Sequence, residues 1–239
     1  MVFAVAERQD FEIKMIHQDL RFYDQLQQFV LFQGMSRSEL LQMAGNTRFG
    51  FQKTGAGKWL VHEGDACRQL YFLIGGSLRL TTHAADRSYA VAEHLSAPWL
   101  VQPEAIFGPT LRYACNVETL TECHFITLSK DELLRLLDDF LIFRLNLLNM
   151  LSASAQRAWQ RYWRRCPQTL EERIVRFFTD HVVYPAGHKE VSILMRQLAT
   201  EVADTRLNVS RVLNDLQDRH LLQLRRGCIV IPSLERLLM

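Results

Sequence analysis

The sequence has 239 residues and a formal net charge of +2 at pH 7; 48% of its residues are hydrophobic and 23% are charged. This balance excludes a disordered chain and a membrane-embedded one, because no apolar run approaches the length that spans a bilayer. The length favours two domains with separate cores. The small net charge means that any affinity for nucleic acid must come from locally grouped arginines.

The first residues and the cysteines predict a cytoplasmic protein with no membrane partner. Residues 1–18 carry early acidic side chains rather than a signal-peptide pattern, so we expect a loosely held tail, with Met15 as an alternative start. The cysteines are odd in number and include no C-x-x-C pair, so reduced thiols are expected. They are Cys67, Cys115, Cys123, Cys166 and Cys228.

Two helices are predicted ahead of the first strand-like segment. Apolar residues recur with helical spacing from Leu20 to Phe32. Ser36 and Glu39 then have the spacing of a capping box, in which each side chain bonds the backbone N–H of the other residue.

Between Thr47 and Leu128 the pattern changes to short apolar runs separated by glycine-containing turns. The runs occupy residues 59–61, 70–74, 78–80, 89–91 and 124–126. Many short strands with regular turn signals are typical of an antiparallel barrel or sandwich.

The next region is helical without a breaker. Ser129 and Glu132 form a second capping-box pattern, and we expect a short helix through Leu137 and one long helix from about Asp139. Pro167 stops or kinks the long helix, so a domain boundary is expected there.

The long helix carries an apolar stripe with spacings of 3, 4, 3 and 4 residues. Its members are Leu148, Leu151, Ala155, Ala158 and Tyr162. The stripe lies either against the chain's own barrel or against a second copy of the chain. We favour a homodimer, since the flanking Trp159 and Trp163 add more apolar surface than one small barrel would cover.

After the boundary, Thr169 and Glu172 open another helix with a third capping box, and residues 191–193 have the character of a short strand. Residues 198–216 then predict two short helices joined by a turn at 203–205. The outer side of the second helix suits a DNA major groove; an ordinary helical hairpin with solvated arginines is the alternative. The candidate DNA contacts are Thr205, Arg206, Leu207, Asn208, Ser210 and Arg211.

The chain ends in a predicted hairpin and a short helix. Residues 221–224 and 229–231 form the two strands of this wing, and Arg225 and Arg226 between them are placed to reach phosphates. The last helix begins at 232–233.

This order of elements resembles the Crp/Fnr family of bacterial transcription regulators. The segments from Gly57 to Asp65 and from Leu70 to Leu78 look like its cyclic-nucleotide-binding roll, and Leu198 to Arg211 looks like its DNA-reading unit. The resemblance implies an α+β fold with four parts. These are a tail at 1–18, an antiparallel, jelly-roll-like β-roll sensor domain at 19–138, a long dimerisation helix at 139–166 and a winged helix-turn-helix domain at 167–239.

The family reads bases from four positions of its recognition helix. These correspond here to Arg206, Leu207, Ser210 and Arg211. The two arginines keep donors that suit guanine, whereas Leu207 replaces a glutamate that accepts from cytosine and instead suits a thymine methyl group. The resemblance therefore implies a near-palindromic site whose half-site differs from the usual one.

The effector pocket departs from family members that bind cyclic AMP. Those members carry Gly-Glu and, later, arginine with a small hydroxyl residue, where this sequence has Val101-Gln102-Pro103 and Arg112-Tyr113. Pro103 has no N–H to donate, and Trp159 would fill the space of the adenine. An effector other than cyclic AMP, or none, is expected; Arg112 either binds another anion or is a solvated arginine. The candidate effector contacts are Gln102, Pro103, Arg112, Tyr113 and Trp159.

Other cofactors have little support in the sequence. An iron–sulfur cluster is excluded, because it needs four clustered thiolates and no cysteine precedes Cys67. Haem needs only one or two axial ligands, and isolated candidates are His62, His83, His94 and Cys115. Cys115, Cys123 and His124 have a poor zinc spacing, so no metal site is expected.

We expect a sequence-specific regulator that binds double-stranded DNA as a homodimer and contacts RNA polymerase if it activates transcription. The rival hypothesis is a small-molecule- or haem-binding sensor whose helix-turn-helix serves protein contact. An enzyme is not expected, since the sequence offers no nucleophile–base pair.

Overall fold

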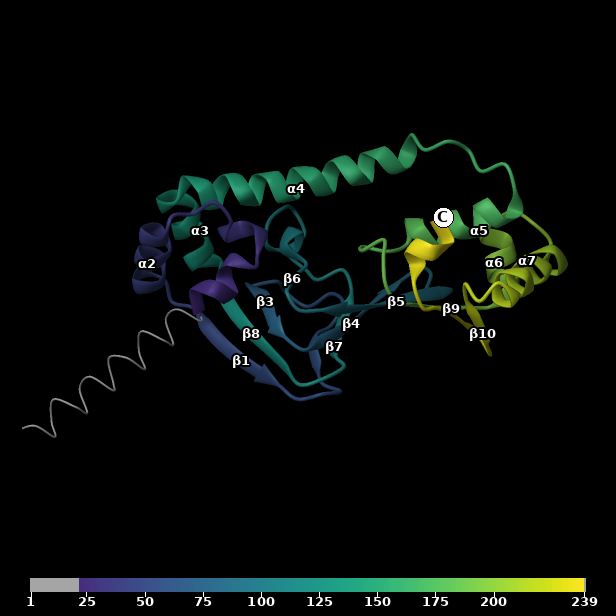
Figure 1. Cartoon of the computed structure of the whole chain (residues 1–239), viewed down its shortest axis with the longest axis horizontal. Helices are drawn as coiled ribbons and strands as arrows, with labels where there is room; N and C mark the ends of the chain where they lie inside the picture. Colours follow the sequence, from purple (N-terminus) through teal and green to yellow (C-terminus); the bar gives the residue numbers. More distant parts are fainter. Residues whose placement is uncertain (1–21, 239) are drawn as a thin grey trace, which may run out of the picture.

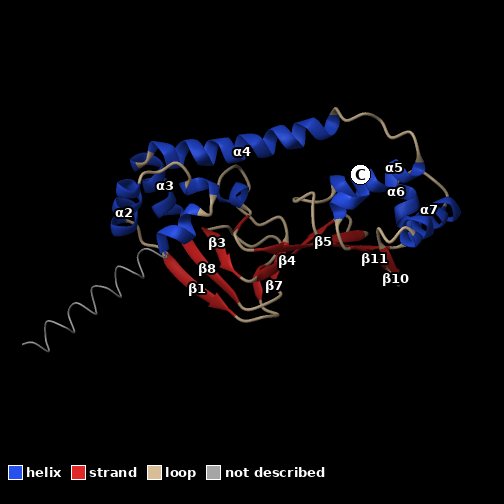
Figure 2. Ribbon diagram, in the orientation of Figure 1, coloured by secondary structure: helices blue, strands red, loops and turns tan. Residues whose placement is uncertain are grey.

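The computed structural model describes residues 22–238, which form two packed regions with one long helix beside them (Figure 1). The predicted tail at 1–18 lies outside these residues. One hydrophobic core fills an N-terminal roll of strands, and a second fills a C-terminal region of helices (Figure 2). The predicted α+β class is confirmed.

The predicted helix at 20–32 is wrong in its second half. Residues 22–27 are helical, but the chain is extended at Phe29 and then forms the 3-10 turn η1 (Val30–Phe32). The break lets Phe29 and Phe32 both contact Phe72, whose ring centroid lies 5.1 Å and 5.6 Å from theirs. Packing of these aromatic rings outweighs the helix propensity of the segment.

Helix α2 (Arg37–Asn46) begins as predicted. The Glu39 N–H donates to Ser36 Oγ over 3.2 Å, and the Ser36 N–H donates to Glu39 Oε2 over 2.7 Å. The predicted capping box is therefore confirmed, and it satisfies donors that the first turn of a helix leaves unpaired.

Two antiparallel sheets form the roll. One has the order β1-β8-β3-β6, and its strands are β1 (Gly50–Thr54), β8 (Cys123–Ser129), β3 (Gln69–Gly75) and β6 (Trp99–Val101). The other contains β2 (Trp59–Val61), β7 (Asn116–Thr119), β4 (Ser77–His83) and β5 (Tyr89–Ser96). A 3-10 turn, η2 (Pro103–Ile106), follows β6.

The five predicted strand runs are confirmed as β2, β3, β4, β5 and β8. The sequence pattern does not predict β1, β6 or β7. The three central residues of β1 are exposed, so it has no apolar alternation. β7 has only four residues, which is too short to show a period. β6 has the same Trp-Leu-Val sequence as the predicted β2, so its own residues do not explain why it is missed.

Helices α3 (Lys130–Asp139) and α4 (Leu141–Tyr162) confirm the predicted pair of one short and one long helix. Ser129 caps α3 by accepting from the Glu132 N–H over 3.3 Å. The reciprocal half of that predicted capping box is wrong. The Glu132 carboxylate accepts instead from Arg135 and from the backbone N–H of Arg48, because it is buried where the chain leaves α2.

Helix α4 runs along one side of the molecule, from the roll toward the C-terminal region (Figure 1). Phe143 and Leu147 are its buried residues, and Asn146 donates to the carbonyl groups of Leu31 and Gln33. These contacts all lie in the first third of the helix. The remainder projects beyond the roll with most of its side chains exposed.

The C-terminal region confirms the predicted order of helix, strand, helix-turn-helix, wing and terminal turn. Its elements are α5 (Leu170–Asp180), β9 (Lys189–Ile193), α6 (Met195–Glu201), α7 (Arg206–Asp218), β10 (Gln223–Arg225), β11 (Cys228–Ile231) and η3 (Leu234–Leu238). Thr169 and Glu172 make both bonds of the predicted capping box at α5. The core of this region includes Ile174, Phe178 and Leu198.

One sheet crosses from the roll into the C-terminal region. β9 pairs with β11 on one side and with β5 on the other, giving the strand order β10-β11-β9-β5-β4-β7-β2 (Figure 2). Val91 of β5 lies within the core of the C-terminal region rather than that of the roll. The two regions therefore share backbone hydrogen bonds and apolar packing as well as a connecting chain.

Candidate nucleic-acid interface

The turn between α6 and α7 is held by local bonds around Asp204. The Asp204 carboxylate accepts from the Thr205 N–H over 2.7 Å, from Asn208 Nδ2 over 2.8 Å and from the Arg173 guanidinium of α5. Ala203 adopts a positive φ of 51°, which closes the turn within three residues. The angle between the two helices is thereby fixed.

Helix α7 has one buried side and one exposed side. Val209, Leu213 and Leu216 are fully buried beneath it. Arg206, Leu207 and Arg211 are exposed, and Leu207 has 61% of its surface accessible. Ser210 is half-buried at the edge of this exposed face. A helix that presents two arginines, a hydroxyl group and an uncovered leucine has the donors and apolar surface that base edges in a major groove accept.

Two of the predicted DNA contacts also serve the turn. Thr205 Oγ1 accepts from the Asn208 N–H over 3.3 Å and so caps α7, and the Asn208 amide donates to Asp204. Both side chains remain exposed. They hold the N-terminus of α7 in place, where its free N–H groups favour a phosphate.

The sequence pattern misses Arg196 and Thr200 of α6. Both line a shallow hollow of about 660 Å³ together with Thr205 and Arg206, on the side where the two helices meet. Arg196 lies in the first turn of α6, where a basic side chain gains nothing from the helix dipole. A basic side chain at this unfavourable position is the sequence signal that could have identified Arg196 as a candidate contact.

The wing places Arg225 and Arg226 at an exposed tip. β10 and β11 pair in register, and Gly227 adopts a φ of 70° in the turn between them. The wing is fastened to α7 by the Leu224 N–H, which donates to Gln217 Oε1 over 2.8 Å. Both wing arginines are therefore carried on the same rigid unit as α7.

The predicted stripe on α4 is uncovered within one chain. Leu148 is 54% exposed and Tyr162 is 81% exposed, and Ala155 and Ala158 between them are exposed as well. Leu151 packs partly against the core of the roll. Leu151 thus packs against the chain's own barrel, and Ala158 lines a pocket beside Tyr89 and Val91, while pairing of the stripe with a second copy stays a prediction.

Three of the predicted effector contacts are bonded to other groups of the roll. Gln102 is buried and its amide oxygen accepts from the Ala114 N–H, and the Tyr113 hydroxyl is buried and donates to the Gln69 carbonyl. Arg112 donates to the carbonyl of Gly64 over 2.6 Å. Trp159 is 64% exposed on α4, with its ring against Tyr162 and Trp163. Pro103, the fifth candidate, begins η2.

A pocket of about 470 Å³ lies instead where the roll, α4 and α5 meet. The Tyr89 hydroxyl and His181 Nε2 lie 2.8 Å apart at this junction. Arg161 donates to two carbonyl groups, those of Asp180 and Val182, and so ties α4 to the end of α5. The polar lining residues are Thr82, His83, Tyr89, Glu104, Ser154, Arg157, Arg161, Asp180 and His181.

The thiols, His62 and His83 have ordinary surroundings. All five cysteines are free, and burial raises the pKa of Cys115 to about 12, which keeps that thiol protonated at neutral pH. His83 pairs with Glu63 over 3.0 Å, and the His62 ring packs on Trp59. Within residues 22–238, no helix is both long enough and apolar enough to cross a membrane.

Comparison with known protein families finds two matching regions in this chain. Residues 51–140 match the cyclic nucleotide-binding domain, and residues 172–239 match the Crp-like helix-turn-helix domain. No curated protein matches the chain.

Solved structures of low sequence identity are similar to this chain. The sensor domain of the transcriptional regulator DNR from Pseudomonas aeruginosa is 20% identical, with a TM-score of 0.50 over 66% of this chain and 99% of that one. The catabolite activator protein of Thermus thermophilus is 17% identical, with a TM-score of 0.48 over 87% of this chain and 96% of that one.

Proposed function

Because this chain joins a cyclic nucleotide-binding domain to a Crp-like helix-turn-helix domain and so belongs to the Crp/Fnr family of transcription regulators, we propose that it binds specific double-stranded DNA as a homodimer. The observation that carries this proposal is the division of α7. Its apolar side is fully buried at Val209 and Leu213, while Arg206 and Arg211 stand exposed on the opposite side.

The homodimer follows from the uncovered stripe on α4. Leu148, Ala155 and Tyr162 repeat on one side of the helix, and the spacing matches the seam of a two-stranded coiled coil. Pairing through this stripe would give two copies of α7 related by a two-fold axis. Two recognition helices about 34 Å apart fit successive major grooves of a near-palindromic site.

Leu207 sets the expected half-site. An exposed leucine offers no hydrogen bond and favours a thymine methyl group, whereas Arg206 and Arg211 favour guanine. The half-site should therefore combine guanines with a thymine.

The effector is proposed to be something other than cyclic AMP, or absent. Gln102 is buried and bonded to the backbone of Ala114, and Pro103 provides no N–H. Of the described cavities, the pocket among the roll, α4 and α5 is the better place for a small ligand, since a ligand there would contact all three. As a regulator of this kind the protein would act in the cytoplasm, and would contact RNA polymerase if it activates transcription.

Selection of binding sequences from a random duplex pool tests the proposal. We expect an inverted repeat whose half-sites contain guanines and lie about one DNA turn apart. A gel-shift series in rising salt with the recovered duplex should give log K that falls linearly with log salt. If no duplex is enriched, and the chain instead binds other proteins with an affinity that does not change with salt, the rival hypothesis is favoured. In that hypothesis the helix-turn-helix serves protein contact.

A further inference from the structure

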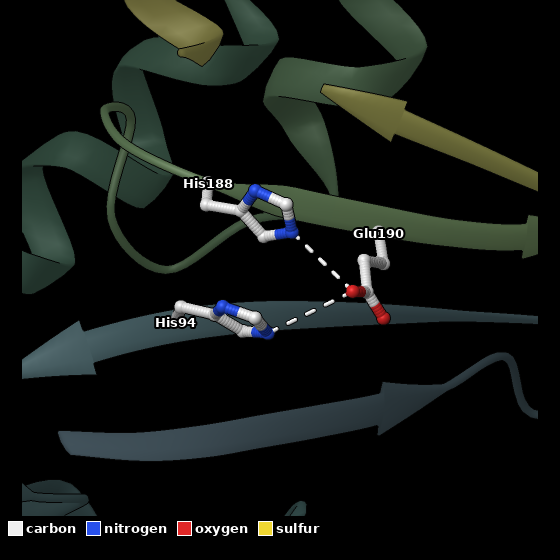
Figure 3. Close-up of side chains that lie close together, drawn as sticks. All are labelled: His94, His188 and Glu190. Atoms are coloured by element: carbon white, nitrogen blue, oxygen red, sulfur yellow. Dashed lines mark hydrogen bonds and ion pairs between the residues drawn. The ribbon is translucent and has the colours of Figure 1, made fainter. Parts of the chain in front are cut away.

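Three metal-binding side chains meet where the roll and the C-terminal region share their sheet. His188 Nε2 lies 3.3 Å from Glu190 Oε1, and His94 Nε2 lies 3.9 Å from the same oxygen. The two imidazole rings stack with their centroids 4.3 Å apart. Figure 3 shows both rings turned toward the Glu190 carboxylate, and one ligand atom from each residue lies within 4.8 Å of the others.

Strand pairing between β5 and β9 fixes this arrangement. Ala92 of β5 is paired with Glu190 of β9, and the His94 N–H donates to the His188 carbonyl over 3.2 Å. The backbone therefore holds the three side chains on one face of the sheet. His94 belongs to the roll, whereas His188 and Glu190 belong to the C-terminal region, so the cluster spans the two.

The three groups are prepared to act as ligands. His94 Nε2 is buried without a hydrogen-bond partner. Arg79 binds the second carboxylate oxygen over 2.6 Å, which leaves Oε1 to face the rings.

We propose that His94, His188 and Glu190 bind a divalent transition-metal ion of the zinc class at the junction of the two regions. Two imidazole nitrogens and one carboxylate oxygen form a donor set that zinc takes with one position left open. Ligands of a tetrahedral zinc lie about 3.3 Å apart, because each is about 2.0–2.2 Å from the ion. The His188–Glu190 separation already has this value, and the His94–Glu190 separation is 3.9 Å.

Arg79 would not touch the ion but binds the Glu190 carboxylate from the other side. A group that binds the second oxygen of a ligating carboxylate fixes its orientation and is worth a substantial factor in metal affinity. Hard cations such as magnesium prefer all-oxygen sites, so the cluster should discriminate against them.

The bound ion would join β5 to β9 by bonds stronger than those of the strand pair. Because α7 and the wing are carried with β9, metal binding would hold the recognition helix in one position relative to the roll. This consequence rests on the proposed function, whereas the metal site itself does not.

Titration of the untagged, full-length chain with Zn²⁺ after chelator treatment tests the site. We expect one tight site per chain, with affinity at least about tenfold lower in each of His94→Ala and His188→Ala. When the heat of binding is recorded during the titration, Mg²⁺ should produce no saturable signal. His124→Ala is the matched control, since it removes a histidine that also pairs with a carboxylate, Glu122, but lies outside the cluster and the pocket. That variant should bind Zn²⁺ like the original chain.

Hydrogen exchange supplies the second readout. Zn²⁺ should slow exchange of the β9 amides in the original chain and in His124→Ala, but not in His188→Ala. Absence of a saturable site, or equal binding by all variants, would overturn the proposal. If Zn²⁺ binds as expected but no DNA sequence is retained with or without it, the metal site stands and the proposed function fails.

Discussion

Asp204 is the residue on which the geometry of the recognition unit most depends. Hydrogen bonds from Asn208 and from the Thr205 N–H, together with Arg173, lower the pKa of its carboxyl group. Bonds between residues so close in sequence could be anticipated from the turn pattern. Arg173, which comes from α5, could not, because its position depends on how α5 packs.

Replacing Asp204 with asparagine should lower the free energy of unfolding at neutral pH, because the charge that pairs with Arg173 is lost. The folded-state pKa of Asp204 lies below its unfolded value of about 3.9, so its contribution is present above that pH and is lost as the pH falls through the folded pKa. Urea unfolding of the two proteins should therefore show a stability gap at neutral pH that closes toward pH 3. A constant gap would contradict the assignment.

Arg211 and Arg226 should contribute differently to DNA binding. Arg211→Ala should cost about 1–3 kcal/mol and relax specificity at one base pair, because a bidentate contact to guanine is lost. Arg226→Ala should weaken binding to all sequences and reduce the salt slope by about 1, as for a phosphate contact. Gel shifts on the selected duplex and on its single-base variants measure both. Arg219→Ala is the control, since Arg219 pairs with Glu171 and Asp215 at the far end of α7.

At the scale of elements, local signals predict helices better than strands. Capping boxes at Ser36 and Thr169 and the apolar period of α7 depend on residues close in sequence, and all three are present in the structure. β1, β6 and β7 escape prediction because their pairing partners, not their own residues, make them strands. The effector candidates could not be placed from sequence for a related reason: Trp159 lies exposed on α4, whereas Arg112 bonds to Gly64 within the roll.

The stripe on α4 gives a prediction about assembly. Leu148→Asp should convert the dimer to a monomer, because an unpaired charge would be buried at the seam. Gln160→Glu is the matched control, since Gln160 is exposed on the opposite side of the helix. Sedimentation equilibrium should find two chains in the control and one in the variant. Dimers in both would place the contact elsewhere.

At the scale of the whole molecule, the shared sheet is the feature that the sequence least reveals. Residues of β5 and β9 lie about a hundred positions apart, and neither strand shows which partner it will take. The same separation along the sequence prevents recognition of the cluster of His94, His188 and Glu190. In the sequence these residues are one histidine and, much later, a His-x-Glu segment.

A buried ion pair also joins the two regions. Lys189 of β9 is fully buried and lies 3.3 Å from Glu93 of β5, and it donates to the Ala186 carbonyl over 2.7 Å. Burial lowers the pKa of Lys189, and the charge of Glu93 opposes that shift. Glu93 accepts further bonds from the N–H groups of Val183 and Tyr184.

Lys189→Met should therefore lower the free energy of unfolding by about 3–5 kcal/mol, because it leaves the Glu93 carboxylate buried without its cation. Glu93→Gln should also lower the free energy of unfolding, because it leaves the Lys189 ammonium buried without its anion and offers one oxygen to two backbone N–H groups that now bind separate oxygens. Urea unfolding followed by tryptophan fluorescence measures both changes. A loss below about 1 kcal/mol for Lys189→Met would mean that the two regions separate easily and that the pair is solvated, as surface pairs are.

The central claim is that two copies of α7 read base edges in successive major grooves, and methylation interference at guanine N7 tests it most directly. On a selected duplex, the proposed function predicts that methylated guanines block binding in two clusters about 10 base pairs apart, on the same face of the DNA. Arg211→Ala should remove one position from each cluster. Binding that is indifferent to guanine N7 methylation, or a single cluster, would contradict the claim.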